Sequence, residues 1–129
     1  YNLFNREPEE EGILRQAKEN GTGFIAFSPL AQGLLTNRYL NGIPEDSRMA
    51  RGGFLKKEQL TEDVLSKIKA LNKMAEERGQ TLAEMALAWV LKDDLVTSVI
   101  IGASSVAQLE DNLKAIRNTS FTKEELRRL

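Results

Sequence analysis

The sequence contains two apolar runs that each end in a turn of small residues: GFIAFSPLAQG at residues 23–33 and VTSVIIGASS at residues 96–105. Short, continuously apolar runs are typical of β-strands in a parallel sheet that helices cover on both faces. The carboxyl ends of such strands, with the turns that follow them, are where α/β proteins bind nucleotide phosphates. The two runs therefore predict strands over 23–28 and 96–101 and a ligand site at their carboxyl ends.

The segments around these strands show the helical spacing of apolar residues. Capping boxes at Thr81 with Glu84 and at Thr122 with Glu125 mark the start of two helices. The predicted helices cover about residues 8–20 and 61–78, and further helices begin near residues 81, 106 and 122.

Spacing also predicts which side chains of these helices are buried. Trp89 lies in an apolar helical stripe, so core packing is favoured over a role as a platform for a ligand. The helix after Ser105 is expected to turn one apolar face inward, formed by Val106, Leu109, Leu113 and Ile116.

The order of elements predicts the architecture. Residues 1–6 are interpreted as the end of a strand, followed by a helix, a strand, a long irregular loop over 30–54, two helices, a strand and two helices. Alternating strands and helices indicate parallel βα units. Two strands and a stub cannot close a sheet, and the chain opens on Tyr1 without an initiator Met. Residues 1–129 are therefore interpreted as a single-domain piece of a larger barrel or sheet.

Composition excludes several classes of function. The 129 residues carry a net charge of −1, which leaves no basic surface for nucleic acid or acidic lipid, and no apolar run is long enough for a membrane span. There is no cysteine, so we expect a cytoplasmic protein without disulfides or thiolate metal sites. There is also no histidine, the commonest general base and metal ligand, and no catalytic or metal-binding constellation is found.

The second turn has two interpretations. Ser105 and Gln108 have the spacing of a capping box, and Asp111 and Asn112 fit a polar surface. Alternatively, Gly102 allows close approach of the backbone, and the helix that follows offers free N–H groups and a partial positive charge to a phosphate.

The first turn is equally open. Phe27 could stack on a flat heterocycle at the rim of the sheet, or it could be a core residue. The nucleotide fingerprints GxGxxG and the P-loop are absent. The loop that follows carries Arg38, Arg48 and Arg51, which fit either a functional loop or a solvated basic loop.

FSPLAQGLLT at residues 27–36, together with IGAS at 101–104, Gln108 and Asn112, resembles the aldo-keto reductases. The opening YNLFNR and the loop NGIPEDSR support the same resemblance, which covers the whole chain. It is closest to bacterial glyceraldehyde 3-phosphate reductase-like members and more distant from potassium-channel β subunits. The family has a (β/α)8 TIM barrel and transfers a hydride from NADPH to a carbonyl. The resemblance implies that the chain is the C-terminal part of that barrel, from the end of strand six through helix eight.

The resemblance also implies a set of NADP(H)-binding residues. Phe27 would stack on the nicotinamide, the turn after it would hold the pyrophosphate, and the second turn would hold the adenosine 2′-phosphate and adenine. The residues implied are Phe27, Ser28, Pro29, Leu30, Gln32, Arg38 and Arg48 at the first site, and Gly102, Ser104, Gln108, Asp111 and Asn112 at the second.

This chain departs from the family pattern at several positions. Many reductases have a Lys at position 102, an Arg at 108 and a Glu at 111, where this chain has Gly102, Gln108 and Asp111. The resemblance still implies NADP in preference to NAD. The family's catalytic Asp, Tyr, Lys and His belong to its N-terminal half and have no counterpart here, and Tyr39 is not the missing tyrosine.

Three functions follow as hypotheses. The first is the cofactor-binding part of a reductase of small carbonyl compounds, inactive without the half-barrel that carries the catalytic residues. The second is a non-catalytic NADP-binding module similar to channel β subunits. The third is a half-barrel that associates with itself through open sheet edges.

Overall fold

The structure, a computed structural model, describes residues 1–45, residue 50 and residues 57–129. Its sheet has two parallel strands, β1 (Ile25–Ala26) and β2 (Ser98–Val99), with Ile25 opposite Ser98 and Ala26 opposite Val99. Backbone hydrogen bonds continue the pairing at both ends, from Thr97 N to Phe24 O (2.8 Å) and from Ile100 N to Ala26 O (2.8 Å). The predicted parallel pairing is therefore confirmed, although the strands are shorter than predicted.

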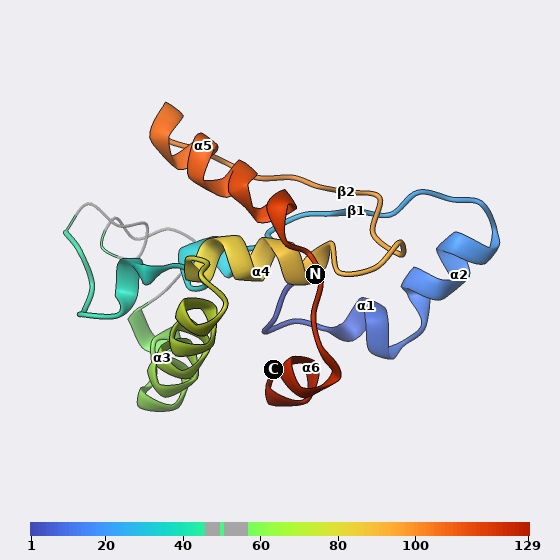
Figure 1. Ribbon diagram of the computed structural model, residues 1–129. Coiled ribbons are helices and arrows are strands. Elements are labelled where there is room, and N and C mark those ends of the chain that lie inside the picture. The colour runs from blue at the N-terminus through green and yellow to red at the C-terminus, as the bar shows by residue number, and fades with distance from the viewer. Residues whose placement is uncertain (46–49, 51–56) are drawn as a thin grey trace.

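Helices pack on one side of this pair of strands and at its ends (Figure 1). Four of these helices begin with the same N-cap, in which a hydroxyl accepts a hydrogen bond from the backbone N–H three residues later. The capping residues are Thr61, Thr81, Ser105 and Thr122. The α-helices are α1 (Glu7–Glu10), α2 (Ile13–Glu19), α3 (Glu62–Glu77), α4 (Leu82–Val90), α5 (Val106–Leu113) and α6 (Lys123–Arg128), and the 3-10 helices are η1 (Ala31–Gly33), η2 (Asn37–Tyr39), η3 (Lys57–Gln59) and η4 (Lys114–Arg117).

The single helix predicted over residues 8–20 is wrong, because the chain forms two helices there. Gly12 separates α1 from α2 and has a φ of +76°, a left-handed conformation that ends the first helix. A Cβ at this position would meet nothing within 4 Å, so the backbone conformation alone accounts for the glycine.

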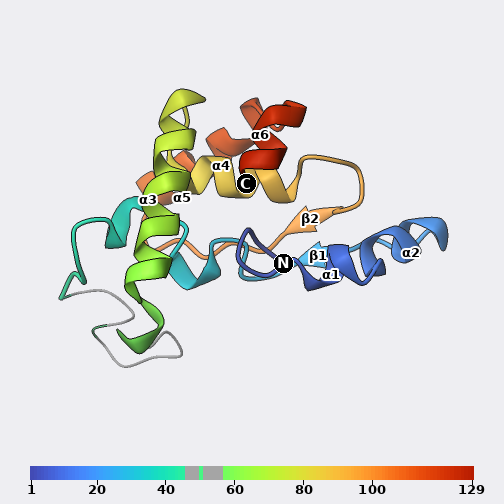
Figure 2. The same cartoon turned by 90° about the horizontal axis from the view of Figure 1, so that it is seen from below.

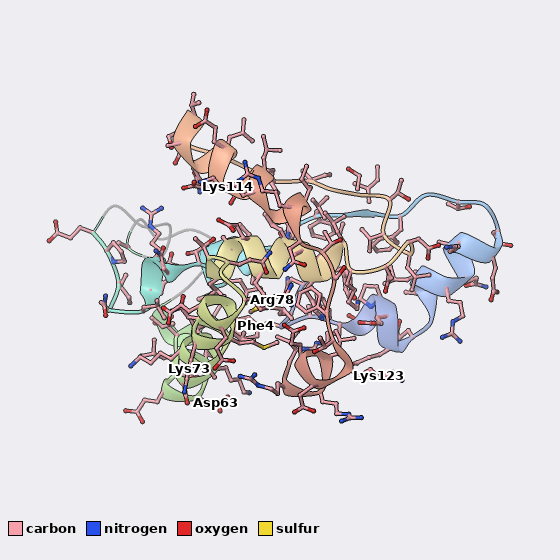
Figure 3. The ribbon with its side chains drawn as sticks, viewed as in Figure 1. Phe4, Asp63, Lys73, Arg78, Lys114 and Lys123 are labelled. Atoms are coloured by element: carbon pink, nitrogen blue, oxygen red, sulfur yellow. The ribbon has the colours of Figure 1, made fainter. Side chains whose placement is uncertain are left out.

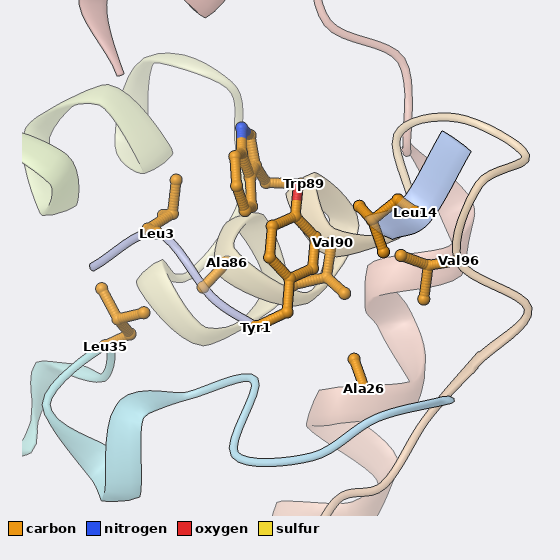
Figure 4. Close-up of a cluster of buried hydrophobic side chains, with 9 residues drawn as sticks. All are labelled: Tyr1, Leu3, Leu14, Ala26, Leu35, Ala86, Trp89, Val90 and Val96. Carbon is orange, nitrogen blue, oxygen red and sulfur yellow. The ribbon is translucent and has the colours of Figure 1, made fainter. Parts of the chain in front are cut away.

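The helix α4 forms the centre of the core. It lies along one side of the two strands, with α3 and α6 packed beyond it (Figures 1 and 2). One cluster of buried side chains joins α4 to the N-terminal segment and β1, and Trp89 lies inside it as predicted (Figure 4). Its members are Tyr1, Leu3, Leu14, Ala26, Leu35, Ala86, Trp89, Val90 and Val96. A second cluster, which includes Tyr39 and Ile68, joins α4 to α3 and η2.

Residues 1–6 form a turn instead of the strand end that was predicted. Asn2 and Asn5 exchange backbone hydrogen bonds of 3.0 Å, which closes the turn. The segment nevertheless lies beside β1, because the backbone nitrogen of Tyr1 donates to Phe27 O (3.3 Å).

Two predictions of burial are wrong within this chain. Ala26 of β1 is buried, but Ile25 and Ile100 are exposed, so helices cover only one face of the strands. On α5, the predicted inward face is exposed and the buried residue is instead Asn112. The exposed residues of that face are Val106, Leu109, Leu113 and Ile116. No other element of the described chain lies over these two apolar surfaces. Among the described residues, no helix is both long and apolar enough to cross a membrane.

Candidate functional site

The two turns singled out in the sequence leave the same edge of the sheet. Because β1 and β2 are parallel and in register at Ala26 and Val99, the chain emerges from both strands on one side. The first turn runs into η1, and the second runs into the N-terminus of α5 (Figure 1). A backbone hydrogen bond from Ile100 N to Ala26 O (2.8 Å) holds the carboxyl ends of the two strands together, so both turns leave the same edge, as predicted.

The first turn has an unusual backbone. Ser28, Ala31 and Gln32 all have positive φ, at 52°, 47° and 58°. Residues other than glycine rarely adopt this conformation, and such residues concentrate at functional sites. Hydrogen bonds within the turn include those from Ala31 N to Ser28 O (3.0 Å) and from Gly33 N to Leu30 O (2.9 Å).

The side chains of this turn divide into two groups. Phe27 is 69% exposed, which excludes the interpretation of Phe27 as a core residue of this chain, and Ser28 is also exposed. Pro29 is buried, and Leu30 packs against the first core cluster. Gln32 is half-buried. Phe27 and Ser28 thus face outward at the edge, while Pro29 and Leu30 anchor the turn to the core.

The basic loop is only partly described. Arg38 is exposed on η2, and its backbone nitrogen donates to Thr36 Oγ1 (3.2 Å). Thr36 Oγ1 in turn donates to Gly33 O (2.7 Å), so η2 is tied to the first turn. Arg48 and Arg51 lie outside the described residues. Tyr39 belongs to the second core cluster and is not exposed at the site.

The second turn is closed by hydrogen bonds between its own side chains. Ser105 caps α5 by accepting from Gln108 N (3.2 Å). The capping box predicted for this pair is incomplete, because Gln108 Oε1 accepts from Ser104 N (2.7 Å) and Ser104 Oγ (3.0 Å) and not from Ser105 N. Gly102 and Ser104 are exposed. The other backbone N–H groups in the first turn of α5 have no acceptor within the helix, because no helical residue precedes them.

Asp111 and Asn112 lie in different environments. Asp111 is exposed and pairs with Lys114, whose Nζ is 2.5 Å from Asp111 Oδ1 (Lys114 is labelled in Figure 3). This hydrogen bond raises the pKa of Lys114. Asn112 is only 5% exposed, which contradicts the interpretation of Asn112 as a polar surface residue. Its Nδ2 is buried without a hydrogen-bond partner among the described residues, an arrangement that native proteins rarely tolerate.

The described residues contain no evident acid–base catalyst at this edge. Burial, followed by the hydrogen bond to Glu9 Oε2 (2.7 Å), raises the pKa of the Tyr1 phenol, which makes it a poor proton donor. No group of three or more His, Cys, Asp or Glu side chains in the described part of the chain could hold a metal ion.

The comparison with known proteins agrees with this geometry. The family model described as "Aldo/keto reductase family" matches residues 1–129. The chain belongs to the aldo/keto reductase family. This aldo/keto reductase chain is 55% identical over 130 residues to L-glyceraldehyde 3-phosphate reductase of Escherichia coli, a match that covers 98% of the chain and 38% of that enzyme. It is 41% identical over 119 residues to a probable voltage-gated potassium channel subunit beta of Arabidopsis thaliana, covering 90% of the chain and 36% of that protein.

Solved aldo-keto reductases have the same arrangement of elements. One from Bacillus halodurans in its holo form superposes with a TM-score of 0.66 at 29% identity, over 99% of this chain and 38% of its own. A thermostable aldo-keto reductase in complex with the inhibitor epalrestat gives a TM-score of 0.65 at 26% identity, over 98% of this chain and 35% of its own. The helices and small parallel sheet therefore match part of that family's barrel, and the chain spans little more than a third of these relatives.

One residue that contacts the site was missed from the sequence. Asn2 was assigned to a strand end, yet its Nδ2 donates to Ser28 O (3.0 Å) in the first turn. The available signal was Asn2 itself, since an Asn side chain often closes a turn by bonding the backbone two residues later, as Asn2 Oδ1 does with Phe4 N.

Proposed function

We propose that this chain is the NADP(H)-binding portion of an aldo-keto reductase that reduces aldehydes or ketones. The observation that carries the proposal is the meeting of the two turns at one edge of the parallel pair, in a chain 55% identical to a reductase. In this proposal residues 1–129 are one domain fragment, from the end of strand six through helix eight of a (β/α)8 barrel. A cytoplasmic location accords with the absence of cysteine.

The residues present fit such a cofactor. The exposed ring of Phe27 offers a face on which the nicotinamide can stack, and the turn from Ser28 to Gln32 would hold the pyrophosphate, with Arg38 and Arg48 nearby in sequence. The Nδ2 of Asn112 lacks a hydrogen-bond partner among the described residues but is buried, so the side chain would have to turn outward to donate to the adenine.

The 2′-phosphate would be held at the start of α5. Ser104 would exchange its hydrogen bonds with Gln108 for bonds to the phosphate, next to the unpaired amides and positive end of the helix dipole. Gly102 would allow close approach, and Asp111 would face the adenosine. When bound, the cofactor supplies the hydride, while these residues bind and orient it.

Proton donation to the carbonyl oxygen is assigned to polypeptide outside these 129 residues, because the chain has no His and its described tyrosines are buried. That polypeptide would also cover the exposed face of the strands and complete the barrel around a small carbonyl substrate. We therefore expect the 129-residue chain alone not to oxidise NADPH in the presence of an aldehyde such as L-glyceraldehyde 3-phosphate.

A second candidate is a non-catalytic NADP-binding module, which the 41% identity to a channel subunit beta supports. The higher identity to the reductase favours the enzyme. A Tyr, Lys and His with the family's spacing in the remainder of the full-length protein would support the reductase, and their absence would support the module.

The experiment compares NADPH binding by the full-length protein and its Ser104→Asp variant in a fluorescence titration. Repulsion between the introduced carboxylate and the 2′-phosphate should weaken NADPH binding about tenfold or more and leave NADH binding much less affected. Ser66→Asp, on the exposed side of α3, is the control and should bind NADPH normally. Unchanged NADPH affinity in Ser104→Asp would remove Ser104 from the site, and no binding by the unmodified protein would refute the proposed function.

A further inference from the structure

Asn2 is a buried polar residue that the proposed cofactor site does not use. It is 7% exposed, and both polar atoms of its side chain make hydrogen bonds. Its Oδ1 accepts from Phe4 N (2.9 Å) and Asn5 N (3.0 Å), and its Nδ2 donates to Ser28 O (3.0 Å). One carboxamide therefore closes the N-terminal turn and also reaches the turn after β1, 26 residues away.

The carbonyl that Asn2 holds is at the first left-handed residue of that turn. Ser28 has a φ of 52°, and its carbonyl also accepts from Ala31 N (3.0 Å). The next residue, Pro29, has no N–H, so hydrogen bonds can hold the Ser28–Pro29 peptide only through this carbonyl. The carbonyl before it, Phe27 O, accepts from the Tyr1 nitrogen (3.3 Å), so residues 1 and 2 hold both peptides that follow β1.

A serine does not adopt positive φ without support from its surroundings. Within the described chain, Asn2 is the side chain that donates to Ser28 O, and it comes from a segment whose own turn is closed by the same carboxamide. Since Asn2 is buried, the loss of its donor would leave that carbonyl partly unsatisfied and the turn free to relax.

We propose that Asn2 is a positioning residue, which holds the left-handed turn at Ser28 and thereby presents Phe27 and the amides of the turn to the nicotinamide and pyrophosphate. The identity of the ligand rests on the proposed function, whereas the effect of Asn2 on the turn does not. Asn2 touches no part of the second turn in the described contacts, so its influence should be confined to one end of the cofactor.

The test is Asn2→Asp in the full-length protein. Aspartate keeps the shape and an acceptor for Phe4 N and Asn5 N, but it replaces the donor with an oxygen that faces Ser28 O. We expect NADPH binding to weaken about tenfold. Binding of adenosine 2′,5′-bisphosphate, which would use only the α5 end of the site, should change less than about twofold.

Asn5→Asp is the matched control. It makes the same change of charge in the same turn, but the Asn5 side chain is exposed and its Oδ1 accepts from Glu7 N (3.2 Å). NADPH binding should stay within about twofold of the unmodified protein. If Asn2→Asp does not fold, Asn2→Ser provides the same test, because serine can accept from the turn amides but is too short to reach Ser28 O.

Amide hydrogen exchange without ligand separates this proposal from the proposed function. Faster exchange at Ala31 and Gly33 in Asn2→Asp, with unchanged exchange in α4, supports the positioning role even if the protein binds no nucleotide. Unchanged exchange at Ala31, or an equal loss of NADPH and adenosine 2′,5′-bisphosphate binding, would overturn it.

Discussion

Arg78 and Glu125 form a largely buried ion pair that joins the end of α3 to the C-terminal segment. The Arg78 side chain is almost fully buried, and its Nη1 lies 2.6 Å from Glu125 Oε1 (Arg78 is labelled in Figure 3). Its Nη2 donates to Ser120 O (2.9 Å), and its guanidinium lies 3.8 Å from the centroid of the Phe121 ring. A planar group that donates to several acceptors and also stacks on a ring in this way is characteristic of arginine.

The same carboxylate completes the capping box of α6, and this gives a prediction about pH. The hydrogen bond from Thr122 N (2.6 Å), followed by the contact with Arg78, lowers the pKa of Glu125. Because the unfolded pKa is about 4.3, the ionised carboxylate stabilises the fold above that pH, and this contribution is lost as the pH falls through the lower folded pKa. Glu125→Gln should therefore cost about 1–2 kcal/mol of unfolding free energy at pH 7 and much less near pH 3.

Urea unfolding followed by the fluorescence of Trp89, the one tryptophan in the sequence, measures this difference. The control is Glu124→Gln, whose partner Arg127 is 3.3 Å away on the exposed side of α6 and which should change stability by less than about 0.5 kcal/mol. An equal loss of unfolding free energy in Glu125→Gln at pH 3 and pH 7 would contradict a stabilising role of the ionised Glu125 carboxylate.

At the scale of elements, the local signals predict where helices begin better than where they break. Thr122 and Glu125 form the predicted capping box at α6, whereas at α4 Thr81 accepts from Glu84 N and no return bond from the Glu84 side chain completes the predicted box. The break at Gly12 was not predicted, because Glu, Ile and Leu on either side of it are all compatible with a continuous helix.

Substitution of Gly12 distinguishes a helix broken at this residue from a continuous helix, because the change in unfolding free energy has opposite signs in the two cases. With φ at +76° and nothing within 4 Å of a Cβ, Gly12→Ala should lower the unfolding free energy by about 1 kcal/mol through backbone strain alone. In a continuous helix the same change would raise stability by about 1 kcal/mol. Gly12→Asn is the matched variant and should cost less than alanine, because asparagine tolerates the left-handed region. Urea unfolding curves of the three proteins provide the measurement.

The candidate site was predictable where it depends on neighbouring residues and unpredictable where it depends on distant ones. Apolar runs that end at Phe27 and at Gly102 identify the shared edge, because parallel strands place their carboxyl ends together. The burial of Asn112 and the contact of Asn2 with Ser28 depend on packing between segments far apart in sequence. Helical spacing likewise reveals the apolar face of α5 but not which polypeptide covers it.

At the scale of the whole molecule, α5 presents an apolar side that no element of the described chain covers. One side of the helix, with Asn112 and then Ala115 of η4, is buried, and a second side carries Asp111 in contact with Lys114. The third side is apolar and exposed, and it includes Ile116, which is 69% exposed. The chain also spans only 38% of the reductase it matches. We therefore expect the remainder of the barrel, outside these 129 residues, to cover this third side.

Substitution at Ile116 tests that expectation. In the full-length protein, Ile116→Glu should lower the unfolding free energy by about 2–4 kcal/mol, because an apolar side chain is lost and a charge is buried. In the 129-residue chain the same change should leave stability almost unaltered, since residue 116 is exposed there. Ala107→Glu, on the exposed polar side of α5, is the control and should be neutral in both proteins. If the 129-residue chain instead covers this face by self-association, size-exclusion chromatography should show a dimer that Ile116→Glu converts to a monomer. A neutral Ile116→Glu in the full-length protein would show that the rest of the barrel does not pack on this side of α5.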